Sequence, residues 1–262
     1  RKKKYQIFAA RGVKMEEKKR DVLPCIAVCE GDINPRVLTC GDPARAKKIS
    51  EKLENVKCLA KNREYHTYSG TYKGVPVTVT SHGVGEGGAV IGFESLCRAG
   101  AKVIIRVGTC GGMQKEVTAG SLVIVKAACR EDGVTEKMLP LSYPAVADMD
   151  VVRALEESSG NLQLQAHSGI VLTQALFYPG LLESRVKLYQ KAGVIAMENE
   201  VAGLLVVASL HGIKAGAILA ADAPAFELVG VEGYQPDEEM VALAVEHEIL
   251  IALEALIRID AE

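Results

Sequence analysis

Short apolar runs rich in β-branched residues alternate along this chain with longer segments that carry apolar residues every three or four positions. Seven of the runs have strand character: residues 36–40, 75–81, 102–108, 121–127, 168–173, 194–198 and 214–222. Runs of this length between turn residues are typical of buried β-strands. They predict a largely parallel or mixed sheet.

Segments with helical spacing separate these strands, and most of them end at glycine or at charged residues. They cover residues 42–53, 87–100, 151–159, 183–193, 201–212 and 237–257. The alternation predicts an α/β fold in which helices cover both faces of the mixed sheet. No linker or repeat interrupts the pattern. Residues 1–262 are therefore expected to form a single domain, with residues 1–24 as an N-terminal extension.

Composition narrows the class of protein. A chain of 262 residues with 48% hydrophobic content can bury a substantial core. Its formal net charge of −2 argues against nucleic acid or an anionic membrane surface as a partner. No apolar run reaches the roughly 18 residues that span a bilayer, and the start lacks the features of a secretory signal. A cytoplasmic enzyme-sized protein is the expectation.

Two loops after strands combine arginine with glycine. Because ligands of open α/β sheets gather at the carboxyl ends of strands, these loops are candidate sites. At Gly41 the chain turns into a helix that carries Arg45. A helix start next to a guanidinium favours an anion site, and the alternative is an ordinary turn with a solvated arginine. Arg106 is followed by Gly108 and Thr109. A permanent cation beside a hydroxyl and glycine N–H groups suits phosphate, the alternative being a salt bridge to a neighbouring helix.

A third loop, "SHGVGEGGAV", matches the dinucleotide pattern G-x-G-x-x-G at Gly83, Gly85 and Gly88. A nicotinamide site also needs an acidic residue near the end of the following strand, where this chain has Arg106 and Gly108. An NADP-dependent oxidoreductase is therefore a minor alternative, which requires Arg106 to bind a 2′-phosphate.

Carboxylates follow two further strands. Met197, Glu198 and Glu200 lie at the start of an apolar helix, where acidic side chains either favour the helix dipole or grip a sugar diol. Asp222 ends a very apolar strand. A carboxyl group there is expected to be desolvated and to remain protonated near neutral pH, as a general acid requires, although capping or turn formation is the commoner role.

The order of these motifs resembles one family. "GDPAR", "NREY", "SHGVG", "IIRVGTCGG", "FYPG", "MENE" and the strand that ends at Asp222 follow one another from about residue 25 onward. This order resembles the hexamer-forming nucleoside phosphorylases, which comprise uridine phosphorylases and the bacterial and protozoan type of purine nucleoside phosphorylase. The resemblance implies phosphorolysis of the N-glycosidic bond of nucleosides to a free base and a sugar 1-phosphate. It also implies inorganic phosphate as co-substrate and no organic cofactor.

The resemblance assigns the phosphate contacts within one chain to Gly41, Arg45, Arg106, Gly108 and Thr109. Arg63 of "NREY" is expected to reach the same phosphate from a neighbouring subunit. The resemblance thus implies a homo-oligomer, at least a dimer, with shared active sites.

For the nucleoside, the resemblance assigns Phe177, Met197, Glu198, Asn199, Glu200 and Asp222. Glu200 is expected to hold the ribose hydroxyls, and Asp222 to face the base as the acid of the purine-type enzymes does. Arg106 and Asp222 are accordingly the expected catalytic residues. Glu64 of "NREY" matches a carboxylate that binds a cation at the dimer interface of some uridine phosphorylases, which makes a structural cation at Glu64 a candidate.

Three positions depart from the family pattern. Cys25 stands where the family usually places a histidine near the sugar 5′-hydroxyl, and Asn199 replaces a methionine that packs under the sugar. Gly88 replaces the serine that helps to bind the cation.

The signals for the base conflict. "LTQALFYPG" resembles the uridine branch, but Leu181 and Glu183 stand where that branch has a glutamine and an arginine that bind uracil. Asp222 and the short spacing from "FYPG" to "MENE" resemble the purine branch. The expectation is uridine, from "FYPG", with purine nucleosides such as inosine and guanosine as the alternative. A non-catalytic nucleoside-binding protein would share the same pocket.

Overall fold

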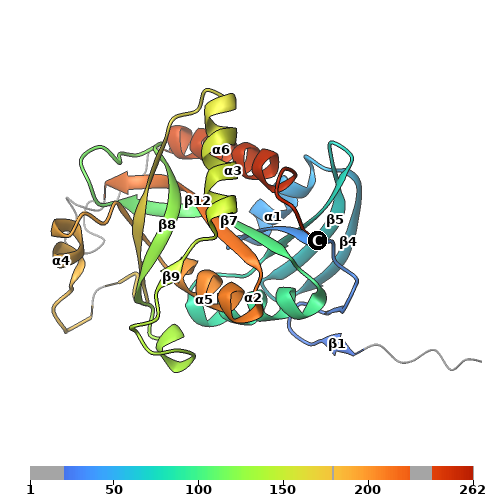
Figure 1. Ribbon diagram of the computed structural model, residues 1–262, viewed down its shortest axis with the longest axis horizontal. Helices are drawn as coiled ribbons and strands as arrows, with labels where there is room; N and C mark the ends of the chain where they lie inside the picture. The colour runs from blue at the N-terminus through green and yellow to red at the C-terminus, as the bar shows by residue number, and fades with distance from the viewer. Residues whose placement is uncertain (1–20, 179, 225–237, 262) are drawn as a thin grey trace, which may run out of the picture.

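One mixed β-sheet flanked by helices organises the computed structural model, which describes residues 21–178, 180–224 and 238–261 (Figure 1). The strands are β1 (Val22–Leu23), β2 (Val28–Cys29), β3 (Arg36–Cys40), β4 (Glu54–Asn62), β5 (Tyr65–Tyr72), β6 (Val75–Ser81), β7 (Val103–Gly112), β8 (Leu122–Glu131), β9 (Ala145–Val146), β10 (Ala166–Gln174), β11 (Ala196–Glu198) and β12 (Lys214–Pro224). The helices are α1 (Pro43–Ser50), α2 (Glu86–Ala99), α3 (Met149–Asn161), α4 (Val186–Lys191), α5 (Val201–His211) and α6 (Glu238–Leu256), with a 3-10 turn at Thr135–Lys137.

The strand order creates a branch point in the sheet. The order is β11-β10-β8-β12-β7-β3-β6-β5-β4, and β11 also pairs with β7 in antiparallel fashion, which closes five strands into a ring. The early part of β7 pairs with β3 as far as Thr39 opposite Arg106, whereas its end pairs with β11 through Gly111 and Gly112. Because β7 exchanges one neighbour for another just after Arg106, the sheet opens there. Ligands bind at such switch points of α/β sheets.

Helices cover both faces of the sheet, as the alternating pattern predicts. Figure 1 shows α3 and α6 on one side and α2 and α5 on the other. Helix α5 is apolar all round, and its residues from Val201 to Ala208 are buried, so it forms part of the core itself. Among the described residues, no helix is long and apolar enough to cross a membrane.

The structure corrects the sequence prediction at two places. The strand predicted to stop at Gly108 continues to Gly112, which places Arg106 inside a strand instead of at a loop. The hairpin of β4 and β5 was not predicted, because its strands carry polar residues at many positions and lack a continuous apolar run. The predicted N-terminal extension falls largely on residues outside the described ranges, and the single-domain organisation stays a prediction.

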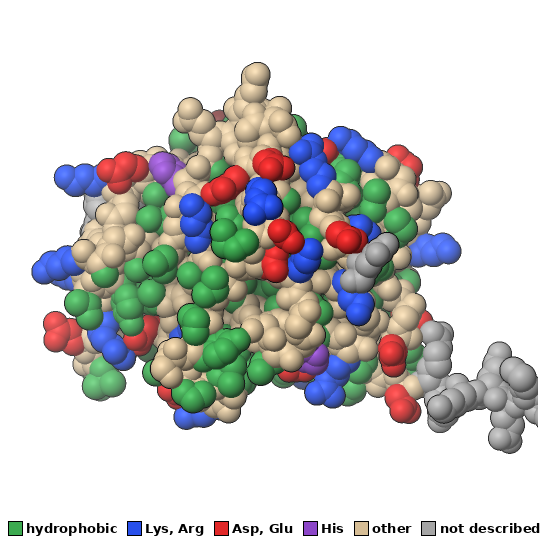
Figure 2. Space-filling model, in the orientation of Figure 1, with side chains coloured by type: hydrophobic (Ala, Val, Ile, Leu, Met, Phe, Trp, Pro, Cys, Tyr) green, Lys and Arg blue, Asp and Glu red, His purple; other side chains and the backbone are tan. Residues whose placement is uncertain are grey.

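Several large apolar side chains remain exposed on the single chain, among them Val84, Leu141, Val146 and Leu210. Figure 2 shows apolar side chains gathered toward the lower part of one face, with charged side chains more frequent above them. Extended exposed apolar surface on a soluble domain is typical of an interface with another chain.

The end of β7 has room for glycine alone at Gly112. A Cβ atom added there would lie 1.8 Å from the backbone carbonyl oxygen of Val117. We predict that Gly112→Ala lowers the free energy of unfolding by about 1–3 kcal/mol, because backbone must move to relieve the overlap. Gly160→Ala in α3 is the matched control, since a Cβ there meets no atom within 4 Å. That change should be neutral or stabilise by up to about 1 kcal/mol. Equal unfolding midpoints in denaturant would contradict the prediction.

Candidate active site

Arg106 lies in the interior of the protein, where β7 leaves β3. Its residue is 3% exposed, so its guanidinium is buried. Gly108 follows two positions later and therefore faces the same side of the strand. A Cβ atom at Gly108 would lie 2.0 Å from Nη1 of Arg106. The missing side chain of Gly108 thus provides the space that the guanidinium occupies, which explains the spacing of the two residues in the sequence.

Two buried carboxylates neutralise Arg106. Its Nη2 lies 3.4 Å from Oε2 of Glu198 and forms a closer ion pair with Glu200. Each glutamate is 5% exposed. Burial raises the pKa of Glu198, and the charge of Arg106 opposes that shift. The predicted alternative of a salt bridge is thus present at Arg106, and its partners are the two acidic residues of "MENE".

Glu198, the last residue of β11, also binds the start of helix α5. Its Oε2 accepts hydrogen bonds from the N–H groups of Glu200 at 2.7 Å and Val201 at 2.9 Å, and its Oε1 accepts one from the Thr173 hydroxyl. These bonds satisfy N–H groups at a helix start, which have no partner within the helix. The role at a helix start that the sequence offered for these acidic residues is therefore present, and the contact with a sugar diol stays a prediction.

The glycine loop between β6 and α2 connects this cluster to the first arginine loop. The N–H of Gly85 donates to Oε1 of Glu200 at 2.6 Å, and the N–H of Gly83 donates to the carbonyl of Gly41 at 2.9 Å. Gly83 and Gly85 have φ angles of 78° and 90°, in the left-handed region that favours glycine. The glycine pattern thus brings the loop backbone against Gly41 and Glu200.

Glu248 is a buried acidic residue at this site that the sequence analysis missed. It comes from α6 and is 0% exposed. Its Oε2 accepts a hydrogen bond from the N–H of Gly108 at 3.2 Å, and its Oε1 lies 3.5 Å from Nη1 of Arg45. Burial raises the pKa of Glu248 to about 8, against the opposing charges of Arg45 and Arg106. In the sequence, the signal that could have identified Glu248 is its position as a glutamate in the apolar stretch "EILIAL" of a predicted helix.

Asp222 sits in a β-bulge at the end of β12. The pairing register between β12 and β7 shifts between Ala221 and Ala223, so Asp222 is the extra residue. Asp222 is half-buried. Bulges of this kind re-aim a side chain and are frequent beside active sites. The buried thiol of Cys110 lies within electrostatic reach of Asp222, Glu248, Glu198 and Arg106, and burial together with these carboxylates raises its pKa. All four charged groups therefore surround the end of β7.

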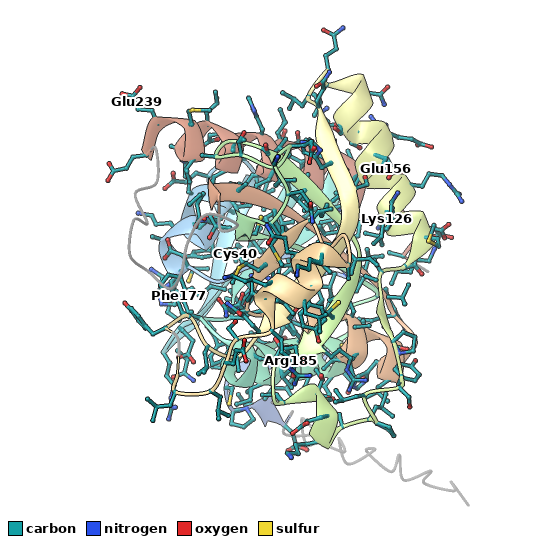
Figure 3. The ribbon with its side chains drawn as sticks, turned by 90° about the vertical axis from the view of Figure 1, so that its left-hand side faces the viewer. Cys40, Lys126, Glu156, Phe177, Arg185 and Glu239 are labelled. Atoms are coloured by element: carbon teal, nitrogen blue, oxygen red, sulfur yellow. The ribbon has the colours of Figure 1, made fainter. Side chains whose placement is uncertain are left out.

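The other predicted nucleoside residues lie around β11 and the end of β10. Met197 and Asn199 are half-buried, and Asn199 donates a hydrogen bond to the carbonyl of Gln174 at 2.6 Å. Phe177 is 55% exposed and forms an edge-to-face contact with Tyr178. Figure 3 shows Phe177 near the edge of the molecule. On the same side, Cys40, the last residue of β3, lies further inside. Thr109 is half-buried on β7.

Arg63 and Glu64 form the two-residue turn between β4 and β5. Arg63 is exposed with a φ of 52°, and it forms no salt bridge with the described residues. The structure therefore does not place Arg63 with the other predicted phosphate residues of its own chain. Glu64 packs against Gly83 and lies near Gly88. No group of three or more His, Cys, Asp or Glu side chains within the described ranges could hold a metal ion, and the cation at Glu64 stays a prediction.

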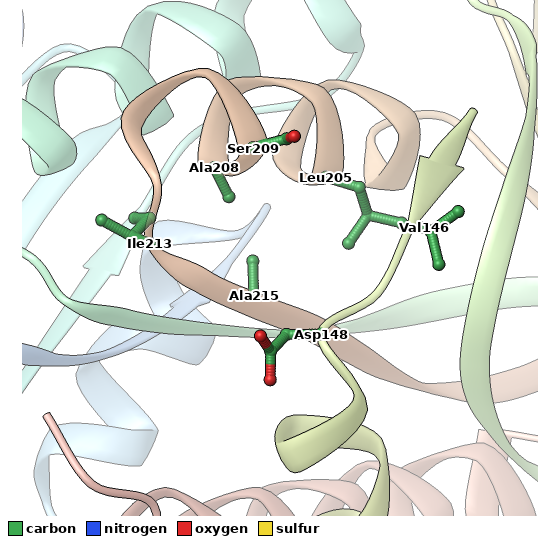
Figure 4. Close-up of a pocket in the computed structure, with 7 residues that line it drawn as sticks. All are labelled: Val146, Asp148, Leu205, Ala208, Ser209, Ile213 and Ala215. Atoms are coloured by element: carbon green, nitrogen blue, oxygen red, sulfur yellow. The ribbon is translucent and has the colours of Figure 1, made fainter. Parts of the chain in front are cut away.

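A shallow hollow of about 140 Å³ lies elsewhere, between α5 and the beginning of β12 (Figure 4). Ala215 in its lining precedes Asp222 by seven positions on the same strand, which is roughly 20 Å. Asp148, its acidic residue, caps α3 by accepting the N–H of Asp150 at 2.9 Å. The hollow is thus remote from the charged cluster.

Comparison with known proteins gives consistent matches. The family described as "Phosphorylase superfamily" matches residues 35–258. The chain is 37% identical over 237 residues to a purine nucleoside phosphorylase of Plasmodium falciparum, covering 90% of this chain and 96% of the relative. It is also 37% identical over 207 residues to a uridine phosphorylase of Thermococcus kodakarensis, covering 74% of this chain and 75% of the relative.

Solved structures are similar over nearly the whole chain. The purine nucleoside phosphorylase of Toxoplasma gondii in complex with immucillin-H has a TM-score of 0.84 at 35% identity, covering 90% of this chain and 95% of that one. The uridine phosphorylase of Vibrio fischeri has a TM-score of 0.85 at 29% identity, covering 92% of this chain and 100% of that one.

The buried triad of Arg106, Glu198 and Glu200 predicts a pH-dependent loss of stability. We expect Arg106→Ala to lower the free energy of unfolding by about 3–5 kcal/mol, because two buried carboxylates lose their cation. A buried carboxyl whose pKa is raised above its usual 4.5 takes up protons on folding, so stability falls as pH rises. In denaturant titrations, the loss of unfolding free energy caused by Arg106→Ala should therefore be larger at pH 8 than at pH 5.

The control is Arg98→Ala, since Arg98 pairs with Glu94 in an exposed ion pair on α2. It should change stability by less than about 0.5 kcal/mol at either pH. A deficit for Arg106→Ala that matches this control would show that the buried triad does not stabilise the fold.

Proposed function

Because this chain belongs to the phosphorylase superfamily, we propose that the cluster around Arg106 is the active site of a nucleoside phosphorylase that prefers purine nucleosides. Nucleoside phosphorylases are pentosyltransferases that use phosphate as co-substrate and need no organic cofactor, and this activity follows from the family. The family gives no support to the NADP-dependent reductase. The residue roles and the preferred base are the proposal, and its main support is the buried Arg106 held between Glu198 and Glu200 at the sheet branch.

In this proposal, phosphate binds between the two arginine loops. Arg106 and Arg45 supply guanidinium charge, while Gly41, Gly108 and Thr109 supply backbone N–H or hydroxyl donors. The support is geometric, since Glu248 lies near both Arg45 and Gly108 and within electrostatic reach of Arg106. Doubly charged phosphate suits two arginines, whose forked donors bind oxyanions through two hydrogen bonds.

The sugar is proposed to bind to Glu200, next to Met197 and Glu198. Glu200 accepts hydrogen bonds from Arg106 and from the N–H of Gly85. A carboxylate held by such rigid groups is oriented to accept hydrogen bonds from sugar hydroxyls. Arg106 is then shared between the phosphate and the carboxylate of Glu200, so the two substrates are held side by side.

This arrangement accounts for the chemistry of phosphorolysis. Cleavage of the glycosidic bond develops positive charge on the sugar and negative charge on the leaving base. A phosphate on the opposite face of the sugar stabilises the first charge, and a proton donor at the base stabilises the second. Binding both substrates in one site makes the attack of phosphate effectively intramolecular.

The base preference is proposed from the residues near Asp222. The uridine expectation rests on "FYPG" and remains untested, because the relatives include both purine and uridine phosphorylases. Leu181 is fully exposed, and neither it nor Glu183 supplies the amide and guanidinium that uracil would require. Asp222 is placed by a bulge at the end of the active-site strand β12, where a protonated carboxyl can donate to N7 of a purine. Purine nucleosides therefore fit this chain better.

Steady-state kinetics test this proposal. Inosine and guanosine should give a higher kcat/KM than uridine, and release of the base should require phosphate. Asp222→Asn should lower kcat/KM for inosine by about a hundredfold or more, because an amide cannot transfer a proton to the base. Asp150→Asn, at an exposed aspartate paired with Lys214, is the control and should retain full activity.

The other outcomes are equally specific. A higher kcat/KM for uridine would show that the preference is for pyrimidines. Release of base without phosphate would indicate a hydrolase, and nucleoside binding without any release would indicate a binding protein.

We also propose that active sites are shared between subunits of a homo-oligomer, with Arg63 donated by a neighbour. Arg63 is exposed at the tip of the β4–β5 hairpin. Asn62 beside it donates hydrogen bonds to the carbonyls of Pro24 and Cys25, which fixes the segment where the family usually has a histidine from the adjacent subunit. A cytoplasmic location and a cation at Glu64 stay predictions.

Complementation between two inactive variants tests the shared site. Arg63→Ala and Asp222→Asn should each be nearly inactive, whereas co-expressed subunits should regain about a quarter of wild-type activity. This value follows because half of randomly formed dimers are hybrids, and each hybrid has one intact site. Absence of regained activity in purified hybrids, or a fully active monomer in sedimentation, would contradict the shared site.

A further inference from the structure

The carboxyl group of Glu248 occupies donors that the proposed phosphate site needs. Its Oε2 accepts the N–H of Gly108 at 3.2 Å, and its Oε1 lies 3.5 Å from Nη1 of Arg45. The side chain of Glu248 is 0% exposed, whereas that of Arg45 is 18% exposed. An internal carboxylate therefore binds, in this structure, the groups on which an incoming phosphate dianion would depend.

Phosphate and an ionised Glu248 are electrostatically incompatible neighbours. If phosphate takes the N–H of Gly108 and the guanidinium of Arg45, an ionised Glu248 is left buried beside a dianion, with the backbone N–H of Ala220 as its remaining hydrogen-bond donor. A buried charge with so few partners is strongly unfavourable, and such a group takes up a proton instead. A protonated carboxyl also gains an O–H donor, which an adjacent phosphate oxygen can accept.

We propose that Glu248 is a positioning residue of the phosphate site that takes up one proton from solvent when phosphate binds. Ionised Glu248 holds Arg45 and Gly108 in place, and neutral Glu248 donates its proton in a hydrogen bond to the bound phosphate. This inference rests on the proposed phosphate site. It adds a proton to the binding equilibrium of the co-substrate.

The other groups that face Glu248 do not titrate in the relevant range. Arg45 from α1 and Arg106 from β7 remain charged at all accessible pH values. Burial raises the pKa of Cys40 on β3 to about 12, and burial also raises that of Cys110 on β7 well above its usual range. Burial lowers the pKa of His82, which adjoins the same arginines, so it is neutral above pH 7. Glu248 itself has a pKa of about 8. Glu198 faces Arg106 from β11, and burial raises its pKa as well. Loss of the proton uptake in a variant of Glu248 therefore assigns the proton to Glu248.

Calorimetry of inorganic phosphate binding to the wild-type enzyme is the first test. Titrations at pH 9 in buffers of different ionisation enthalpy give the number of protons taken up per phosphate bound. Phosphate itself is a dianion throughout this range. We expect close to one proton per site at pH 9, and an affinity that falls by up to about tenfold per pH unit above pH 8.

Two variants of the same helix separate charge from structure. Glu248→Gln cannot ionise, but its amide can still accept the N–H of Gly108 and donate to phosphate. It should abolish proton uptake and make phosphate affinity nearly independent of pH between 8 and 9.5. At pH 9 it should bind phosphate up to about tenfold more tightly than the wild type. Glu246→Gln, whose carboxylate pairs with Lys48 and Lys52 at the surface, should behave as the wild type does.

Each result decides a different question. Phosphate binding by the wild type without proton uptake at pH 9 overturns the inference and leaves the phosphorylase proposal intact. A wild-type pH profile in Glu248→Gln also overturns it. Failure of the wild type to bind phosphate at all would overturn both. If Glu248→Gln does not fold, absence of proton uptake in the wild type still overturns the inference.

Discussion

The ion pairs of Arg106 with Glu198 and Glu200 form the interaction on which the rest of this structure depends. They join β7 to β11 and to the start of α5, and Glu200 extends the connection to the glycine loop through the N–H of Gly85. Burial of charges in an interior is tolerated when each charge is paired and hydrogen-bonded. The buried guanidinium of Arg106 must be paired with acidic side chains. This electrostatic requirement holds the elements of the site together.

The same cluster contains more acidic groups than one arginine can neutralise. Glu198, Glu200 and Glu248 are all buried near Arg106, and burial raises the pKa of Glu198 and Glu248. This cluster of buried charges can interact with two kinds of chemical group. Hydroxyl groups of a sugar can donate to a carboxylate, and an anion can compete for the arginines. The proposed active site has to bind both kinds of group next to each other, and this cluster of buried charges offers carboxylate acceptors beside cations.

The branch in the sheet supplies the space for these groups. Strand β7 pairs with β3 up to Arg106 and with β11 at its end, and the bulge at Asp222 shifts β12 against it. The missing side chain of Gly108 leaves room for the guanidinium of Arg106, and that of Gly112 leaves room for the backbone of Val117. Backbone geometry therefore brings side chains from β11 and α6 into contact with the end of β7.

The sequence by itself determined the order of the six helices and of seven strands, the α/β class, and the arginine, glycine and "MENE" motifs, because these depend on local periodicity or on neighbouring residues. It did not determine the hairpin of β4 and β5. It did not determine that Arg106 is buried within a strand, that Asp222 is a bulge residue, or that Glu248 belongs to the site. Glu248 is 140 positions from Gly108 and 203 from Arg45, and Glu200 is 115 from Gly85. Only the tertiary structure decided these contacts, since the burial and pairing of a charged residue depend on which distant strands and helices pack around it.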